Sequence, residues 1–327
     1  MSLDIFNPQI SVVAKGLEGK VITIVGGNNL GKTKQATRMK KPLYLAFEKG
    51  LNAIAGVPFM AINKWSDFKK VVRQLEKNTE KAKEMYQTII FDQVGDSAKF
   101  CSRHICNVYG VDRIKDGNDG FGLWNEYETE YWEQISKLLG PGFTVVFIAH
   151  AEADKTGKFY PKGDKRSLAP VINNSDIVAF LKPNGVDEDG NVIKSSAYLA
   201  ETDEFFARSR FDYIDTYIEE YTAESLEAAI VEAIERQEEE EGIQAVTFTE
   251  QKSTQESEEY DFNEVMEKAT SIINEIMEKD EDNAKKITKI IEKNLGKNSK
   301  LSEAEEEQAD IISLIVDELQ DFLEELE

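Results

Sequence analysis

The sequence predicts an α/β fold in which a mostly parallel sheet is flanked by helices, and two observations lead to this prediction. Short apolar runs rich in β-branched residues alternate with helical patterns through the first two thirds of the chain, which is typical of a parallel sheet covered by helices. The runs are nearly all apolar, as expected of strands buried on both faces. They occupy residues 21–25, 43–47, 88–91 and 144–149.

Helical patterns fill the connections between these strands: one begins after Gly31, and others cover residues 65–87 and 123–139. A further strand pair is predicted at 177–181 and 195–199, on either side of a turn region rich in Pro, Asn, Gly and Asp. Residues 151–175 show no periodicity. We expect them to form a long loop, and a loop of that length in a compact domain is usually functional or disordered.

The charge of the chain is concentrated in its last third. The formal net charge is −23, but residues 222–327 carry 32 acidic and 10 basic side chains, whereas residues 1–221 carry 30 and 29. The front part is therefore close to neutral, and the overall acidity does not argue against nucleic-acid binding there. The change in composition predicts a core at 1–221, an acidic helix and flexible linker at 222–259, and a small acidic helical domain at 260–327.

Within the acidic part, residues 225–236 have the pattern of an amphipathic helix, and residues 243–258 have the composition of a linker. Apolar residues then recur at helical spacing over 262–277, 283–295 and 304–326. This pattern predicts either a small helical bundle or helices that order only with a partner.

Several classes of protein are disfavoured by the sequence. No run approaches the roughly 18 apolar residues of a membrane span, and the N-terminus lacks the features of a signal peptide. Cys101 and Cys106 flank His104, which is too small a set for a metal site. We expect idle or buried thiols in a reducing cytoplasm.

The strongest motif is a strand followed by the pattern G-x4-G-K-T. Glycines let successive backbone N–H groups face phosphate oxygens, and the following helix adds its positive end. In this pattern Lys32 reaches the β- and γ-phosphates, and the Thr33 hydroxyl binds Mg²⁺. The sequence thus predicts a site for ATP and Mg²⁺ made by Gly26, Gly27, Asn28, Asn29, Leu30, Gly31, Lys32 and Thr33.

Two acidic residues at predicted strand ends complete the expected chemistry. Asp92 follows an apolar strand and is the candidate for holding the Mg²⁺ water shell, with Asp96 in reserve. Glu48 ends another strand, at the sheet edge where such folds place their ligands. Glu48 is either the base that orients water toward the γ-phosphate or an ordinary exposed acid.

These pieces, in this order, resemble the RecA-like recombinase ATPases, most closely their small phage-encoded members. The resemblance covers roughly residues 18–215 and includes a strand that ends in His150 before a long loop. It implies that Glu48 activates water and that His150 senses the γ-phosphate and signals to a DNA-binding loop. RecA itself has Gln at this position, so we expect the sensor here to behave differently or to respond to pH. The resemblance also implies a homo-oligomer, in which Arg208 and Arg210 would reach the γ-phosphate of a neighbouring subunit; a plain surface pair is the alternative.

The segment after His150 has the composition that single-strand binding requires, because cations follow the phosphodiester backbone and aromatic rings stack on unpaired bases. The acids Glu152, Asp154 and Asp164 reduce its positive charge, so a solvated surface loop is the alternative. A second segment at 112–122, with Arg113 and Lys115, is a weaker candidate contact. The predicted DNA-binding residues are Lys155, Lys158, Phe159, Tyr160, Lys162, Lys165 and Arg166.

Three functions are compatible with these features. The first is an ATP-dependent recombination protein that binds single-stranded DNA and promotes pairing or annealing, with the acidic tail recruiting a protein partner or competing with DNA. The alternative for the tail is a solvated segment that only keeps the protein soluble. The second is a nucleotide switch that acts on a protein through its helical tail without binding DNA. The third is a small-molecule kinase, although the chain shows neither an arginine-rich lid nor a defined substrate pocket.

Overall fold

The computed structural model describes residues 5–48, 50–255 and 260–326, and its contacts divide the chain into two compact units. The larger unit is Gln9–Thr254, and the smaller one holds the described residues of Met1–Pro8 and Gln255–Glu327. Each unit is built around a hydrophobic core of its own.

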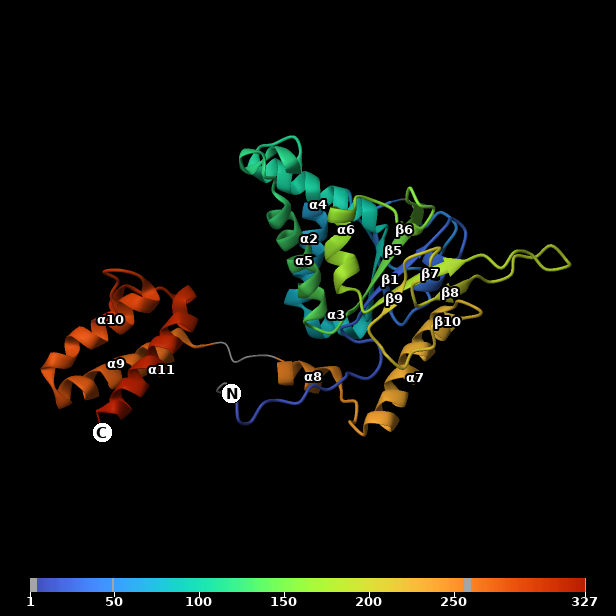
Figure 1. Ribbon diagram of the computed structural model, residues 1–327. Helices are drawn as coiled ribbons and strands as arrows, with labels where there is room; N and C mark the ends of the chain where they lie inside the picture. The colour runs from blue at the N-terminus through green and yellow to red at the C-terminus, as the bar shows by residue number, and fades with distance from the viewer. Residues whose placement is uncertain (1–4, 49, 256–259, 327) are drawn as a thin grey trace. The chain divides into compact units, whose positions relative to one another are not determined.

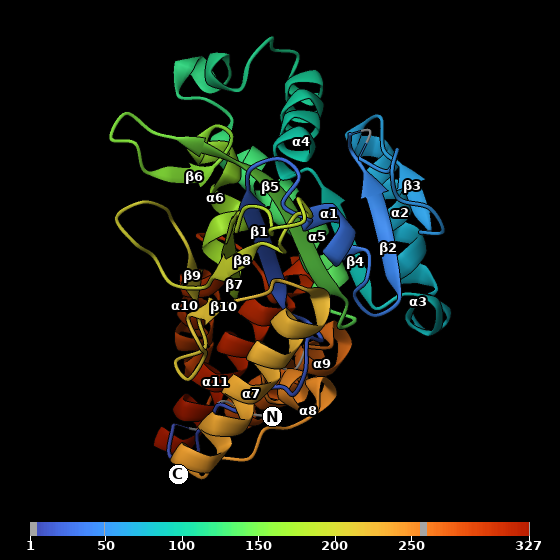
Figure 2. The ribbon, with the colours of Figure 1, turned by 90° about the vertical axis from the view of Figure 1, so that its right-hand side faces the viewer.

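A sheet of ten strands forms the centre of the larger unit (Figures 1 and 2). Six strands run parallel in the order β7-β1-β5-β4-β2-β3, while the short β6, β8, β9 and β10 pair antiparallel. The predicted mostly parallel sheet is therefore confirmed. The strands are β1 (Val21–Gly26), β2 (Pro42–Ala46), β3 (Phe59–Ala61), β4 (Thr88–Asp92), β5 (Thr144–Ala153), β6 (Phe159–Pro161), β7 (Ile177–Lys182), β8 (Ser196–Tyr198), β9 (Arg208–Ser209) and β10 (Tyr217–Ile218).

Helices cover both faces of this sheet (Figure 1). Side chains alternate across a strand, so in β1 Val21 and Val25 pack toward one cluster of apolar residues while Ile22 and Ile24 pack toward another. Helices α2 to α6 contribute to the first cluster, and α7 contributes to the second. The helices of this unit are α1 (Lys32–Ala36), α2 (Trp65–Lys77), α3 (Thr79–Met85), α4 (Val94–Tyr109), α5 (Trp124–Leu139), α6 (Lys165–Asn174), α7 (Ala223–Glu241) and α8 (Phe248–Gln255).

The expectation of a long loop at 151–175 is wrong. Strand β5 continues to Ala153, turns, and pairs with β6 as a hairpin, and α6 follows. Helix α6 begins because the Asp164 side chain accepts a hydrogen bond from the backbone N–H of Ser167 at 2.9 Å. It buries Leu168 and Val171, so one face of it is anchored to the core.

Helix α7 packs on the sheet rather than standing apart from it. Its apolar side chains, Leu226 and Ile230 among them, are fully buried in the second cluster. The Thr222 side chain starts the helix by accepting a hydrogen bond from the Ser225 N–H at 3.0 Å. Composition separates residues 222–259 from the core, whereas the contacts group α7 with the sheet, and α8 lies within the segment for which composition predicts a linker.

The smaller unit is a helical bundle. Its helices are α9 (Phe262–Lys279), α10 (Ala284–Leu295) and α11 (Ala309–Glu325). Their apolar faces meet in a core that includes the fully buried Ile276, Ile312 and Ile315. In the described ranges, no helix of either unit is both long enough and apolar enough to cross a bilayer.

Candidate nucleotide-binding site

The predicted site residues meet where the central strands end. Strand β1 ends at Gly26, which lies in register with His150 of β5. Strand β4 ends at Asp92, in register with Ala46 of β2, and Glu48 lies two residues beyond the end of β2. Because the strands are parallel, these positions share the carboxyl edge of the sheet, the usual place for a ligand in an α/β fold.

The loop between β1 and α1 has the backbone shape of a phosphate-binding turn. Asn29 and Gly31 have φ of 62° and 83°, a conformation that residues other than glycine seldom adopt. The Lys32 ammonium donates hydrogen bonds to the carbonyl oxygens of Gly26 (2.9 Å) and Gly27 (2.5 Å). Burial lowers the pKa of Lys32 to about 8, although Asp92 and Glu48 act in the opposite direction. Among the described residues no carboxylate forms an ion pair with Lys32, and a buried cation in this state is well suited to receive a phosphate oxygen.

A carboxylate lies beside the hydroxyl group that would bind the metal. Asp92 is buried, and its Oδ2 accepts hydrogen bonds from Thr33 Oγ1 at 2.6 Å and Tyr44 OH at 3.0 Å. Burial raises the pKa of Asp92 even though these two hydroxyls and Lys32 stabilise its charged form. A buried carboxylate and a hydroxyl in contact are ligands that Mg²⁺ prefers, so Thr33 and Asp92 fit a magnesium site.

Glu48 and His150 lie opposite each other across the same edge, with Glu48 Oε1 and His150 Nε2 4.0 Å apart. Burial, followed by the charges of Asp92 and Asp96, raises the pKa of Glu48. Burial and the charge of Lys32 lower the pKa of His150. A carboxylate with a raised pKa is a better base toward water, and a neutral imidazole can both donate and accept a hydrogen bond.

Three residues of this site were missed from the sequence. Tyr44 is buried inside β2 and donates to Asp92. Gly50 leaves no room for a side chain, because a Cβ there would lie 2.3 Å from Tyr44 OH and 3.1 Å from Asp92 Oδ2. Gln93 follows Asp92, and its Oε1 is buried without a hydrogen-bond partner among the described residues. Its place next to the metal-site carboxylate was a signal in the sequence that could have identified Gln93.

The predicted DNA-binding residues lie on the β5–β6 hairpin and at the start of α6. Lys155, Lys162 and Lys165 are exposed, and Phe159 is 42% exposed. Lys162 joins the hairpin to the nucleotide site, since its backbone N–H donates to the His150 carbonyl at 2.7 Å.

Most members of this set have partners within the chain. The Lys165 ammonium lies 4.7 Å from the centre of the Tyr160 ring, and the Phe159 ring lies 6.1 Å from that of Phe180. Lys158 pairs with Glu201 at 2.5 Å. The Tyr160 ring stacks on Phe206, with centroids 6.1 Å apart. The guanidinium group of Arg166 lies 4.7 Å from the centre of the Trp124 ring and 3.6 Å from Glu128.

The two predicted arginine fingers lie at the opposite edge of the sheet. Arg208 is in register with Val178, near the beginning of β7, whereas the phosphate loop adjoins the end of that strand. Arg208 donates to the carbonyl oxygens of Asn173 and Ser175, at 3.1 and 2.9 Å, and Arg210 pairs with Asp176 at 3.3 Å. The structure thus does not bring this pair to the phosphate loop of its own chain, and both side chains help to hold the end of α6.

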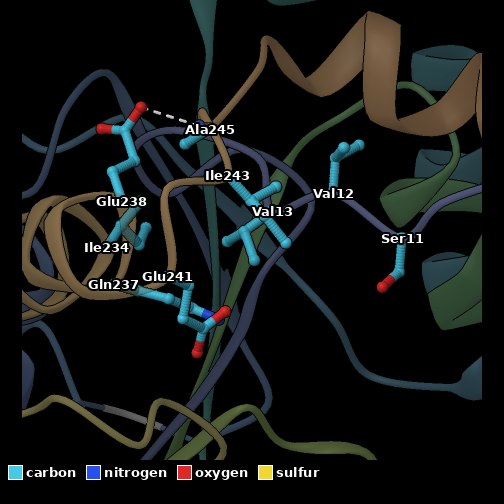
Figure 3. Close-up of a pocket in the computed structure, with 9 residues that line it drawn as sticks. All are labelled: Ser11, Val12, Val13, Ile234, Gln237, Glu238, Glu241, Ile243 and Ala245. Carbon is cyan, nitrogen blue, oxygen red and sulfur yellow. Dashed lines mark hydrogen bonds between the residues drawn. The ribbon is translucent and has the colours of Figure 1, made fainter.

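Other features do not add to the site. Cys101 and Cys106 are buried and form no disulfide, and the described residues contain no cluster of three metal-ligating side chains. A cavity of about 100 Å³ lies between residues 11–13, α7 and residues 243–245 (Figure 3). There Glu238 accepts a hydrogen bond from the Ala245 N–H at 2.7 Å. This cavity lies where the N-terminal segment packs on α7, away from the phosphate loop.

Comparison with known proteins adds two findings. A family model described as "AAA domain" matches residues 18–211, which include the phosphate loop, the sheet and the hairpin. The "SPbeta prophage-derived uncharacterized protein YorG" of Bacillus subtilis (strain 168) is 66% identical over 325 residues, covering 99% of this chain and 100% of that protein. The similarity therefore extends through the helical unit as well.

Proposed function

We propose that this chain, which belongs to the AAA-domain family of P-loop ATPases, hydrolyses ATP at the carboxyl edge of its sheet. In this proposal the bound nucleotide controls the binding of single-stranded DNA by the β5–β6 hairpin. The observation that carries the proposal is the path of β5. Its residue His150 lies beside Gly26 of the phosphate loop, and the same strand continues into the basic hairpin. His150 therefore lies one residue before the hairpin, so a change in its hydrogen bonding acts directly on the start of the hairpin.

Each residue of the site has a defined task in hydrolysis. Lys32 would hold the β- and γ-phosphates, and Thr33 and Asp92 would hold Mg²⁺, which would neutralise negative charge on the phosphates. Glu48 accepts a proton from the attacking water. His150 forms a hydrogen bond with the γ-phosphate and loses it when the phosphate leaves, which alters the position of the Lys162 backbone through their hydrogen bond.

The surface around the hairpin supports a role for a polyanion with unpaired bases. Lys155, Lys162 and Lys165 are exposed cations suited to backbone phosphates, and Phe159 offers a partly exposed ring on which a base can stack. An open cavity of about 480 Å³ borders the start of α6, and its lining includes Arg103, Arg113 and Lys115. This cavity supports the proposal that the 112–122 segment is a second contact for the same DNA strand.

The biological process that we propose is recombination, by pairing or annealing of DNA strands. It rests on the resemblance to RecA-like ATPases, and the prophage origin in the name of the Bacillus relative fits a phage-encoded member. In this proposal the protein works as a homo-oligomer in the host cytoplasm, and the acidic helical unit contacts a protein partner. Arg208 and Arg210 would act on a neighbouring subunit only after releasing their present partners.

The test is ATP hydrolysis by the full chain with and without single-stranded DNA, in the wild type and in the double variant Lys155→Glu/Lys162→Glu. We expect DNA to stimulate the wild type. In the variant we expect DNA affinity to fall at least about tenfold, and the slope of log K against log salt to drop by about 1.4, while basal turnover remains.

Lys285→Glu/Lys289→Glu is the matched control, because it makes the same charge change on exposed residues of α10. Equal DNA binding by the two double variants would contradict the assignment of the hairpin. Turnover that is indifferent to DNA in the wild type would favour the second candidate, a nucleotide switch that acts through the helical unit. That candidate draws support from the separate core of the bundle.

A further inference from the structure

Gln93 has a buried polar atom with no task in the proposed hydrolysis so far. The residue joins strand β4 to helix α4, directly after the metal-site carboxylate Asp92. Its backbone carbonyl is occupied, since it accepts the N–H groups of Asp96 and Ser97, each at 3.2 Å. Its side-chain Oε1, in contrast, is buried and accepts no hydrogen bond from any described residue.

The orientation of this amide follows from its other end. Gln93 Nε2 points to Asp96 Oδ2 at 3.5 Å, while Lys99 pairs with the second oxygen of Asp96 at 2.7 Å. If the amide were reversed, its oxygen would face a carboxylate, which also offers only acceptors. Asp96 therefore keeps the nitrogen on its own side and directs Oε1 away from itself.

The backbone links Gln93 to the base that we assign to the reaction. The backbone N–H of Glu48 donates to the carbonyl of Asp92 at 3.2 Å, and this carbonyl belongs to the peptide group that leads into Gln93. The charge of Asp96, the partner of the Gln93 amide, is one of the causes that raise the pKa of Glu48. Glu48, Asp96 and Gln93 thus belong to one cluster at the end of β4.

We propose that Gln93 is a second acceptor for the attacking water: Oε1 takes a hydrogen bond from one proton while Glu48 removes the other. Water has two protons, and one acceptor alone leaves it free to rotate. Two acceptors fix both O–H bonds and thereby turn a lone pair of the oxygen toward the phosphorus atom. During attack the new P–O bond forms with this lone pair, the proton passes to Glu48, and ADP departs with the electrons of the breaking P–O bond. Asp96 is a positioning residue that holds the amide in the useful orientation.

This inference rests on the proposed function, because it assumes ATP hydrolysis with Glu48 as the base. Its test measures kcat, the KM for ATP and the Kd for ATP in Gln93→Leu and Gln93→Glu. The control is Gln237→Leu, since Gln237 Nε2 likewise donates to a carboxylate one turn away (Glu241, 3.1 Å) but lies on α7. We expect Gln93→Leu to lower kcat by about 10- to 100-fold, with KM and Kd changed less than about twofold, and the control to match the wild type.

Gln93→Glu separates this role from a merely structural one. It keeps an acceptor at the position but adds a negative charge near Glu48, which raises the pKa of that carboxyl further. We expect the acid limb of its kcat–pH profile to move to higher pH, and turnover above that limb to exceed that of Gln93→Leu.

The inference is overturned if Gln93→Leu keeps the wild-type kcat, if its kcat and ATP affinity fall together, or if both variants lose equal activity at every pH. Glu48→Gln distinguishes a failure of the inference about Gln93 from a failure of the proposed ATP hydrolysis. If that variant loses turnover while Gln93→Leu does not, only the inference fails. If the wild type does not hydrolyse ATP, or Glu48→Gln remains active, the proposed function fails first.

Discussion

The two edges of the sheet carry similar charged residues in very different surroundings. At the amino edge, the Lys20 ammonium donates to the Ala14 carbonyl at 2.8 Å. Arg210 pairs with Asp176, which also accepts the Val21 N–H at 2.8 Å. At the carboxyl edge, the buried Asp92 is contacted by hydroxyls rather than by a paired cation. At the amino edge Arg210 and Asp176 form an ion pair, which helps to hold the fold together. At the carboxyl edge Lys32 and Asp92 affect each other's pKa, yet among the described residues they form no ion pair, which is the arrangement expected where a ligand binds.

Lys20 and Lys32 allow a direct comparison of the two edges, because burial lowers the pKa of each to about 8. Only Lys32 lies at the phosphate loop. We expect Lys32→Met to weaken ATP binding by about 30-fold or more, as expected when a partner of a buried charged contact is lost. Lys20→Met should leave the Kd for ATP unchanged. Calorimetric titration measures the Kd for ATP of both variants, and Tm values establish that each variant is folded. An equal loss of ATP affinity in the two variants would contradict the proposed difference between the edges.

The pH dependence of ATP binding gives a smaller effect of the same origin. Bound phosphates favour the ammonium form of Lys32, so its pKa is higher in the complex than the value of about 8 in the free protein. ATP affinity should therefore be full below pH 8 and fall by up to about tenfold per unit as the pH rises above 8. Lys20→Met should show the same profile. In Lys32→Arg the profile should be flat, because guanidinium does not titrate in this range; a fall in affinity above pH 8 in that variant would assign the titration to another group.

The sheet could be predicted because buried parallel strands appear in the sequence as short continuous apolar runs. The runs at 21–25 and 144–149 lie within β1 and β5. The hairpin and α6 were not predicted, because β6 is only three residues long and α6 contains Pro170, which normally argues against a helix. The N-cap pattern at Asp164 was the available signal for α6.

The sequence predicts those residues of the candidate site whose roles follow from their residue type and from the motif or strand beside them. Lys32 and Thr33 stand in one motif, and Asp92 follows an apolar strand. Tyr44 could not be assigned, because its contact with Asp92 joins residues 48 positions apart. The hydrogen bonds of Arg208 could not be predicted, because its partners are carbonyl oxygens at the end of α6. Backbone carbonyl groups leave no pattern in the sequence.

We propose that the carboxyl edge is an ATP hydrolysis site with Glu48 as its base. The most direct test is a single-turnover measurement of ATP hydrolysis in Glu48→Gln, with the Kd for ATP measured in parallel. The variant keeps the size and polarity of the side chain but cannot accept a proton from water at neutral pH. We predict tight ATP binding with hydrolysis slowed by about 10²- to 10⁴-fold. Hydrolysis at the wild-type rate by a variant that binds ATP normally would contradict the account.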